Sequence, residues 1–167
     1  VTVSSPKLFA SPANITDTTK VIGSTFTLDL KVENISNSAG VEFKFRYDPK
    51  ILNITATRPY KPAAPAEDQT FPADFLYSKG TIWTYTLDRI KGIFELVYSI
   101  GPLAAPKPPA FGSGRVANFT FQVVGKGETT LNIYSVLLGD AAALPIPHDL
   151  TDGYFRNLYP PFGATVK

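Results

Sequence analysis

Three aspartates near the carboxyl end of the chain are the residues whose type and spacing best suit metal chemistry. They are Asp140, Asp149 and Asp152, and turn-forming glycines stand beside them at Gly139 and Gly153. Carboxylate oxygens on loops are ligands that calcium prefers, with backbone carbonyls usually completing about six to eight contacts. The spacing differs from that of an EF-hand, and aspartates also serve simply as turn formers. A structural calcium ion at this cluster is therefore one hypothesis. A second acidic group could serve instead, formed by Glu67, Asp68 and Asp74.

Four asparagines stand in N-x-S/T sequences, which are acceptors for N-linked glycans in secreted proteins. With seven Asn and 27 Ser or Thr among 167 residues, chance alone would give about one such sequence. Threonine-rich strands could also produce the pattern by accident. We interpret the excess as glycosylation outside the cell, at Asn14, Asn34, Asn53 and Asn118.

The chain offers little that could form a catalytic centre. His148 is the single histidine, in a proline-containing stretch that we expect to be a loop, and no G-x-S-x-G nucleophile motif occurs. The absence of cysteine excludes disulfides, thiolate zinc sites and cysteine nucleophiles. The GKG stretch at 125–127 is too short for a phosphate loop and predicts a hairpin turn. We therefore predict a protein without catalytic residues.

Composition narrows the class of partner. The net charge is +2 and the basic residues are scattered, whereas nucleic-acid binding needs a clustered basic face. No apolar run approaches the roughly 18 residues of a membrane-spanning helix. The chain starts at Val1 and contains no methionine, which is typical of a mature product whose leader has been removed. We expect an extracellular or cell-surface protein that neither binds nucleic acid nor spans a membrane.

Alternation of apolar and polar residues predicts the strands that must position these groups. It is clearest at 25–33 and 41–48, where every second side chain is apolar. Asp48-Pro49 then favours a corner between two strands, because a residue before proline avoids the helical region. Further predicted strands are 51–54, 81–87, 93–100, 116–124 and 129–138. The fold class is all-β, a two-sheet β-sandwich with jelly-roll or Greek-key wiring.

Two stretches rich in proline and alanine, 58–79 and 101–111, interrupt this pattern and predict long loops of polyproline character. Trp83 and Tyr85 lie on one side of a predicted strand, and aromatic rings on a sheet can stack on sugars. Aromatic residues at this spacing also commonly belong to a core. A carbohydrate-binding module is therefore an alternative.

Several motifs, in order along the chain, resemble the cohesin family. They are GSTFTL at 23–28, FKFRYDP at 43–49, GSGRVANFTFQVVGKGETTL at 112–131, and LGD at 138–140 followed by DGYF at 152–155. The closing segment is similar to that of archaeal cohesin-like proteins. The resemblance covers residues 20 to 156 and implies a jelly-roll sandwich of about nine strands. We accordingly divide the chain into an extended segment, 1–19, and a single domain, 20–167.

The resemblance also implies a function. Cohesins are binding modules that receive calcium-loaded dockerins on one sheet face, and archaeal relatives often occur without cellulosome machinery. The proline-rich loops and the extra ends depart from the family pattern, and no dockerin-like calcium loop is present here. Protein association without catalysis is the expectation, and a receptor for a dockerin-like partner is one form of it.

The amino-terminal segment suggests another form. Val1, Val3, Leu8 and Phe9 lie in short extended stretches before the family match begins. A strand that enters a neighbouring copy would repeat head to tail and build a filament. The alternative is that the segment pairs within its own domain. We predict a self-assembling subunit of a surface filament or lattice, by strand exchange or by contact between sandwich faces.

Overall fold

The computed structural model describes residues 5–58, 81–100, 110–142 and 144–158, and within these ranges every regular element is a β-strand. The strands are β1 (Lys7–Ser11), β2 (Asn14–Thr16), β3 (Thr25–Arg46), β4 (Leu52–Arg58), β5 (Thr81–Asp88), β6 (Ile93–Ile100), β7 (Ala110–Val123), β8 (Glu128–Asp140), β9 (Asp149–Thr151) and β10 (Gly153–Arg156).

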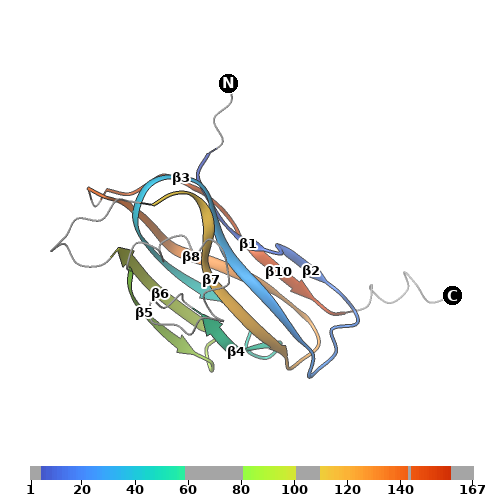
Figure 1. Cartoon of the computed structure of the whole chain (residues 1–167). Helices are drawn as coiled ribbons and strands as arrows, with labels where there is room; N and C mark the ends of the chain where they lie inside the picture. The colour runs from blue at the N-terminus through green and yellow to red at the C-terminus, as the bar shows by residue number, and fades with distance from the viewer. Residues whose placement is uncertain (1–4, 59–80, 101–109, 143, 159–167) are drawn as a thin grey trace, which may run out of the picture.

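The long strand β3 belongs to both sheets of a sandwich (Figure 1). Its first part pairs with β7 and β1, in a sheet of order β4-β7-β3-β1-β9 that we call the β7 sheet. Its second part pairs with β6 and β8, in a sheet of order β5-β6-β3-β8-β10-β2 that we call the β8 sheet. The predicted jelly-roll sandwich is confirmed.

A local irregularity lets β3 turn from one sheet into the other. Asn34 and Asn37 have positive φ angles of 57° and 63°, and the register with β7 shifts on both sides of Ile35. Asparagine tolerates the left-handed region better than most residues, so its presence suits a bend in a continuous strand. The sequence alternation stops here and resumes at Val41.

Phenylalanines from both sheets form the centre of the core. The ring of Phe119, on β7, stacks on Phe45 at 5.0 Å between centroids and meets Phe94 edge-on at 4.9 Å. Phe45 and Phe94 come from the β8 sheet, so these contacts join the two layers. The predicted inward side chains of 25–33 and 41–48 are confirmed, and the fully buried ones are Leu28, Leu30, Val32, Phe43 and Phe45.

The segment 1–19 contributes strands to its own sandwich in this structure. β1 pairs antiparallel with β3 and parallel with β9, and Leu8 is fully buried. β2 pairs with β10 at the far edge of the β8 sheet. The sandwich therefore begins at Lys7 and not at residue 20, and pairing within the domain is the arrangement observed for Leu8 and Phe9. Val1 and Val3 lie outside the described residues.

The predicted hairpin of 81–87 and 93–100 corresponds to β5 and β6, and the turn at 125–127 joins β7 to β8. The two predicted loops, 58–79 and 101–111, fall mostly outside the described residues, as do Glu67, Asp68 and Asp74.

Candidate functional site

The outer surface of the β8 sheet carries the most distinctive combination of exposed side chains. Val41, Phe43 and Phe45 point into the core, so the residues between them on β3 point outward. We call this surface the outer β8 face, and its members are Glu42, Lys44, Arg46, Glu95, Val97, Asn132, Tyr134 and Leu137.

Two exposed apolar side chains lie on this face on either side of one carboxylate. Val97 on β6 and Leu137 on β8 are both register partners of Glu42 on β3, which stands between them. The exposed fractions are 44% for Val97 and 48% for Leu137. Apolar residues that share an exposed sheet face offer area that a partner can bury.

A β-bulge in β8 places Leu137 on the outside. Tyr134 pairs with Lys44 and Leu137 pairs with Glu42, so β8 has one extra residue opposite β3. Ser135 sits in this stretch with a φ of 49°. Without the extra residue, positions 134 and 137 would point to opposite faces, because side chains alternate along a strand. The sequence contains no signal for this bulge, and the exposed leucine was missed.

The charged groups on the outer β8 face include both signs. Lys44 Nζ lies 3.1 Å from Glu95 Oε1, and the Arg46 guanidinium lies 5.0 Å from the centre of the Tyr134 ring. Exposed ion pairs contribute little to stability, so these charges can exchange partners at modest cost. Mixed charges beside apolar side chains are typical of the rim of a protein interface.

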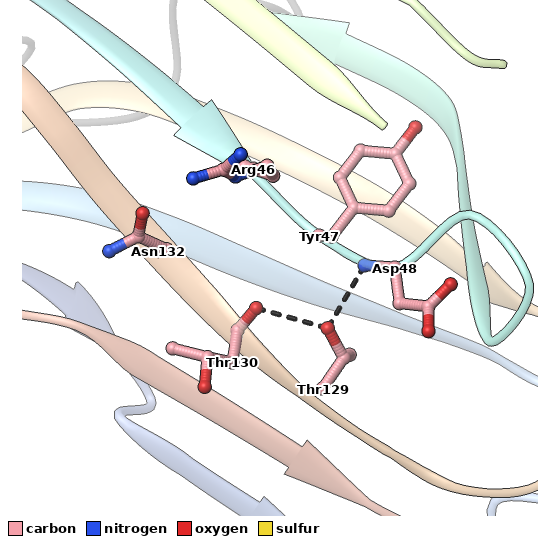
Figure 2. Close-up of a pocket in the computed structure, with 6 residues that line it drawn as sticks. All are labelled: Arg46, Tyr47, Asp48, Thr129, Thr130 and Asn132. Carbon is pink, nitrogen blue, oxygen red and sulfur yellow. Dashed lines mark hydrogen bonds between the residues drawn. The ribbon is translucent and has the colours of Figure 1, made fainter. Parts of the chain in front are cut away.

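One end of the face opens into a hollow of about 490 Å³ (Figure 2). Thr129 links two of the segments that line the hollow. Its Oγ1 accepts a hydrogen bond from the Asp48 backbone N–H at 2.9 Å and donates one to the Thr130 carbonyl at 3.0 Å. The Asp48 carboxylate accepts the Lys50 N–H at 2.8 Å, which confirms the predicted corner. The residues that line the hollow are Arg46, Tyr47, Asp48, Thr129, Thr130 and Asn132.

Tyr47 is 2% exposed, and its hydroxyl has no hydrogen-bond partner of good geometry among the described residues. Burial raises the pKa of Tyr47 above its ordinary value of 10.0, against smaller opposing effects of the Ile54 backbone and the Arg89 charge. The folded state therefore holds this proton more tightly than the unfolded state does. The contribution of this group to stability is lost as the pH rises above about 10.

We expect the free energy of unfolding in urea to fall as the pH rises above about 10, and to fall less in Tyr47→Phe, which has no phenol to ionise there. The same pH dependence in both proteins would contradict this assignment.

The sequence model of the cohesin domain matches residues 12–154, which is most of the chain. This chain belongs to the cohesin domain family. Comparison with curated proteins found no match.

Solved cohesin structures agree with the fold. A non-cellulosomal cohesin from the archaeon Archaeoglobus fulgidus has a TM-score of 0.65 at 13% identity, covering 93% of each chain. A type II cohesin module of the ScaA scaffoldin from Acetivibrio cellulolyticus has a TM-score of 0.68 at 19% identity, covering 98% of this chain and 96% of its own. A type I cohesin–dockerin complex from Clostridium thermocellum scores 0.65 at 13% identity, covering 93% and 95%.

The three aspartates predicted to bind calcium have separate roles in this cohesin domain. Asp140 Oδ1 accepts the backbone N–H groups of Ala142 and Leu144, at 2.9 and 2.8 Å. Asp152 accepts the Ile133 N–H at 2.8 Å and the Asn132 amide at 3.0 Å, and Asp149 begins β9. Among the described residues no three His, Cys, Asp or Glu side chains are grouped to hold a metal ion. Calcium binding stays a prediction without geometric support.

The four predicted glycosylation sites lie on strands. Asn14 is exposed on β2 and accepts the Thr16 hydroxyl at 2.6 Å, and Asn34 is exposed at the bend of β3. Asn53 on β4 and Asn118 on β7 are half-buried. Their occupancy stays a prediction.

The other candidate groups have structural contacts. His148 Nδ1 lies 2.9 Å from the Ile146 carbonyl oxygen of its own loop. The Tyr85 ring stacks on the core residue Phe94 at 5.7 Å, on the inner side of β5. The Trp83 side chain lies outside the described part of the structure. In that part, no helix is long and apolar enough to cross a membrane.

Proposed function

We propose that this cohesin domain is a non-catalytic, extracellular association module that holds a protein partner on the outer β8 face. The observation that supports this most is the exposed pair Val97 and Leu137 around Glu42. Exposed apolar side chains with charged groups close by are a combination that protein interfaces use. The module belongs to a family of which several solved members are complexes of a cohesin with a dockerin. A dockerin-like protein is therefore the first candidate partner.

A second copy of the chain is the other candidate partner, because the outer β8 face carries both acidic and basic side chains. Glu42 and Glu95 stand beside Lys44 and Arg46 on the same face. A surface with both signs can pair with its own copy around a two-fold axis. One two-fold contact closes a dimer, so the filament or lattice subunit predicted from the sequence would need a second contact besides this one. Strand donation by β1 would require this strand to leave β3 and β9 and to expose Leu8.

A photo-crosslinking residue at position 137 tests the proposal while the partner is still unidentified. The matched control carries the same residue at position 122, which lies on β7 in the other sheet. The purified proteins are irradiated with the extracellular proteins of the source cells, and mass spectrometry identifies the product. We expect a defined product from position 137 alone. Peptides of the chain itself in that product would select self-assembly, and another polypeptide would select the receptor. Equal products from both positions would contradict the proposal.

The apolar pair should also dominate the affinity for the partner so identified. Leu137→Asp removes one of the two apolar side chains and adds a second carboxylate beside Glu42, so it should weaken binding by about 30-fold or more, as expected for a central interface residue. Leu150→Asp is the matched control, because Leu150 is 42% exposed but lies on β9 in the β7 sheet. Titration calorimetry measures both dissociation constants. A similar loss in the two variants would place the contact elsewhere.

A further inference from the structure

The sequons at Asn53 and Asn118 lie on one surface, although 65 residues separate them in sequence. On β4 the flanking residues Leu52 and Ile54 are fully buried, so Asn53 points outward. On β7 the flanking residues Ala117 and Phe119 are buried, so Asn118 also points outward. β4 and β7 are neighbours in the β7 sheet, and Asn53 pairs with Gln122. Both asparagines therefore belong to the outer surface of this sheet, which we call the outer β7 face.

The surroundings of the two asparagines on the outer β7 face are polar. Asn118 Nδ2 donates to Asp29 Oδ1 at 2.6 Å, and Arg115 Nη1 lies 3.4 Å from the same oxygen. Along β7, the outward positions after Asn118 are Thr120 and Gln122. Around these positions the described side chains are polar, whereas the outer β8 face carries the exposed pair Val97 and Leu137, so this part of the outer β7 face gives a protein partner less apolar area to bury.

The spacing of the two sequons suits coverage of the outer β7 face. Asn118 is four residues along β7 from Gln122, the partner of Asn53. At the rise of an extended strand this corresponds to about 14 Å, plus one strand spacing of about 5 Å across the sheet. N-linked glycans are bulky and hydrated, and two of them at this distance enclose the surface between their attachment points.

The outer β8 face, unlike the outer β7 face, carries no sequon among its members. None of the residues that make up this face belongs to an N-x-S/T sequence. Asn14 is on β2 at the edge of the β8 sheet, level with Tyr154 on β10 and Thr130 on β8, and Thr130 is seven residues along β8 from Leu137, or about 23 Å. Asn34 lies at the bend of β3, where its amide contacts the Ser5 carbonyl. Neither site pairs with the strand positions of Val97 and Leu137, which we therefore expect to stay uncovered.

We propose that N-linked glycans on Asn53 and Asn118 shield the outer β7 face and restrict protein contacts of this domain to the outer β8 face. Shielding of the outer β7 face does not depend on the proposed function. The statement that partners bind the outer β8 face rests on it. A sugar layer prevents the close packing and desolvation that a protein interface requires.

Occupancy is the first test, and it needs no partner. The chain is secreted from a eukaryotic host, and its glycans are removed with peptide N-glycosidase in heavy-oxygen water. Mass spectrometry then detects the heavy oxygen at each asparagine that carried a glycan. We expect Asn53 and Asn118 to be modified. Absence of modification at both, with glycans at Asn14 or Asn34, would overturn the shield and leave the proposed function unaffected.

Shielding itself can be measured because the natural chain has no cysteine. Gln122→Cys places a single thiol beside Asn53 and four residues along β7 from Asn118, and Leu137→Cys is the control on the outer β8 face. Each protein is labelled with N-ethylmaleimide and with a maleimide on a large polyethylene glycol. We expect Cys at 122 to react with the small reagent and to lose reaction with the large one, whereas Cys at 137 reacts with both.

Removing the acceptors should restore labelling by the large reagent at 122. Thr55→Val with Thr120→Val removes both sequons and keeps the Asn118–Asp29 hydrogen bond. Asn53→Gln with Asn118→Gln is the independent second route. If the large and small reagents label position 122 equally well in the glycosylated protein, the shield does not exist. If neither double variant restores labelling, the protein surface and not the glycan blocks access, and the proposal is also overturned.

Discussion

Replacing Phe119 by alanine should lower the free energy of unfolding by about 3–5 kcal/mol, the range for deleting a fully buried phenylalanine. Phe119 is completely buried, and its ring contacts Phe45, Phe94 and Phe121 at centroid distances of 5.0, 4.9 and 6.1 Å. Because these rings belong to both sheets, the cavity would lie in the layer that joins them. Neighbours held in paired strands cannot collapse into it freely, which places the cost at the upper part of the range.

Urea unfolding, followed by circular dichroism, measures this loss. Phe111→Ala is the matched control, because the same atoms are removed from a side chain that is 66% exposed. We expect the control to change stability by no more than about 0.5 kcal/mol, as for most surface substitutions. Equal shifts of the two unfolding midpoints would mean that Phe119 does not have the central role that its contacts indicate.

Gly92→Ala should have the second large effect. Gly92 is the last residue of the β5–β6 turn and has a φ of 69°, in the left-handed region. A Cβ atom there would lie 2.3 Å from the Tyr47 carbonyl oxygen and 3.0 Å from Pro49 Cδ. The Gly92 carbonyl also accepts the Tyr47 N–H at 3.0 Å, so the two segments cannot separate without losing this bond. The left-handed backbone costs about 1–2 kcal/mol and the overlap about 1–3 kcal/mol more.

Gly23→Ala separates these two contributions. Gly23 has a φ of 95°, and a Cβ atom there would meet nothing within 4 Å. This variant should lose only the backbone contribution of about 1–2 kcal/mol. The difference between the two variants in urea unfolding measures the steric overlap at Gly92. Equal losses would show that the turn at Gly92 relaxes without resistance.

The local elements of this domain follow from the sequence because their causes are local. Period-two alternation predicts the core side of β3, since only one register puts Leu28 and Phe43 inside. Asp48 forms the corner because its carboxylate reaches the backbone two residues on, and the GKG turn joins two alternating runs. These interactions span few residues, so residue type and spacing are enough to predict them.

The pairing of distant segments is different. β1 is a strand of this domain because β3 and β9 accept it on either side, and β9 lies more than 100 residues away in sequence. The same holds for Asp152, which the sequence placed in a calcium cluster and which binds β8 instead. Its oxygens meet Asn132 and the Ile133 N–H only after β10 has paired beside β8.

The sequence by itself thus determined an all-β sandwich of the cohesin type, its core strands and the positions of its four sequons. Alternation, turn residues and motifs are carried by neighbouring residues, and they do not depend on which strands pair. Only the tertiary structure decided which surface each sequon occupies and that Leu137 is exposed beside Val97. The bulge at Ser135 and the bend of β3 between the two sheets set those directions, and both arise from pairing across the fold.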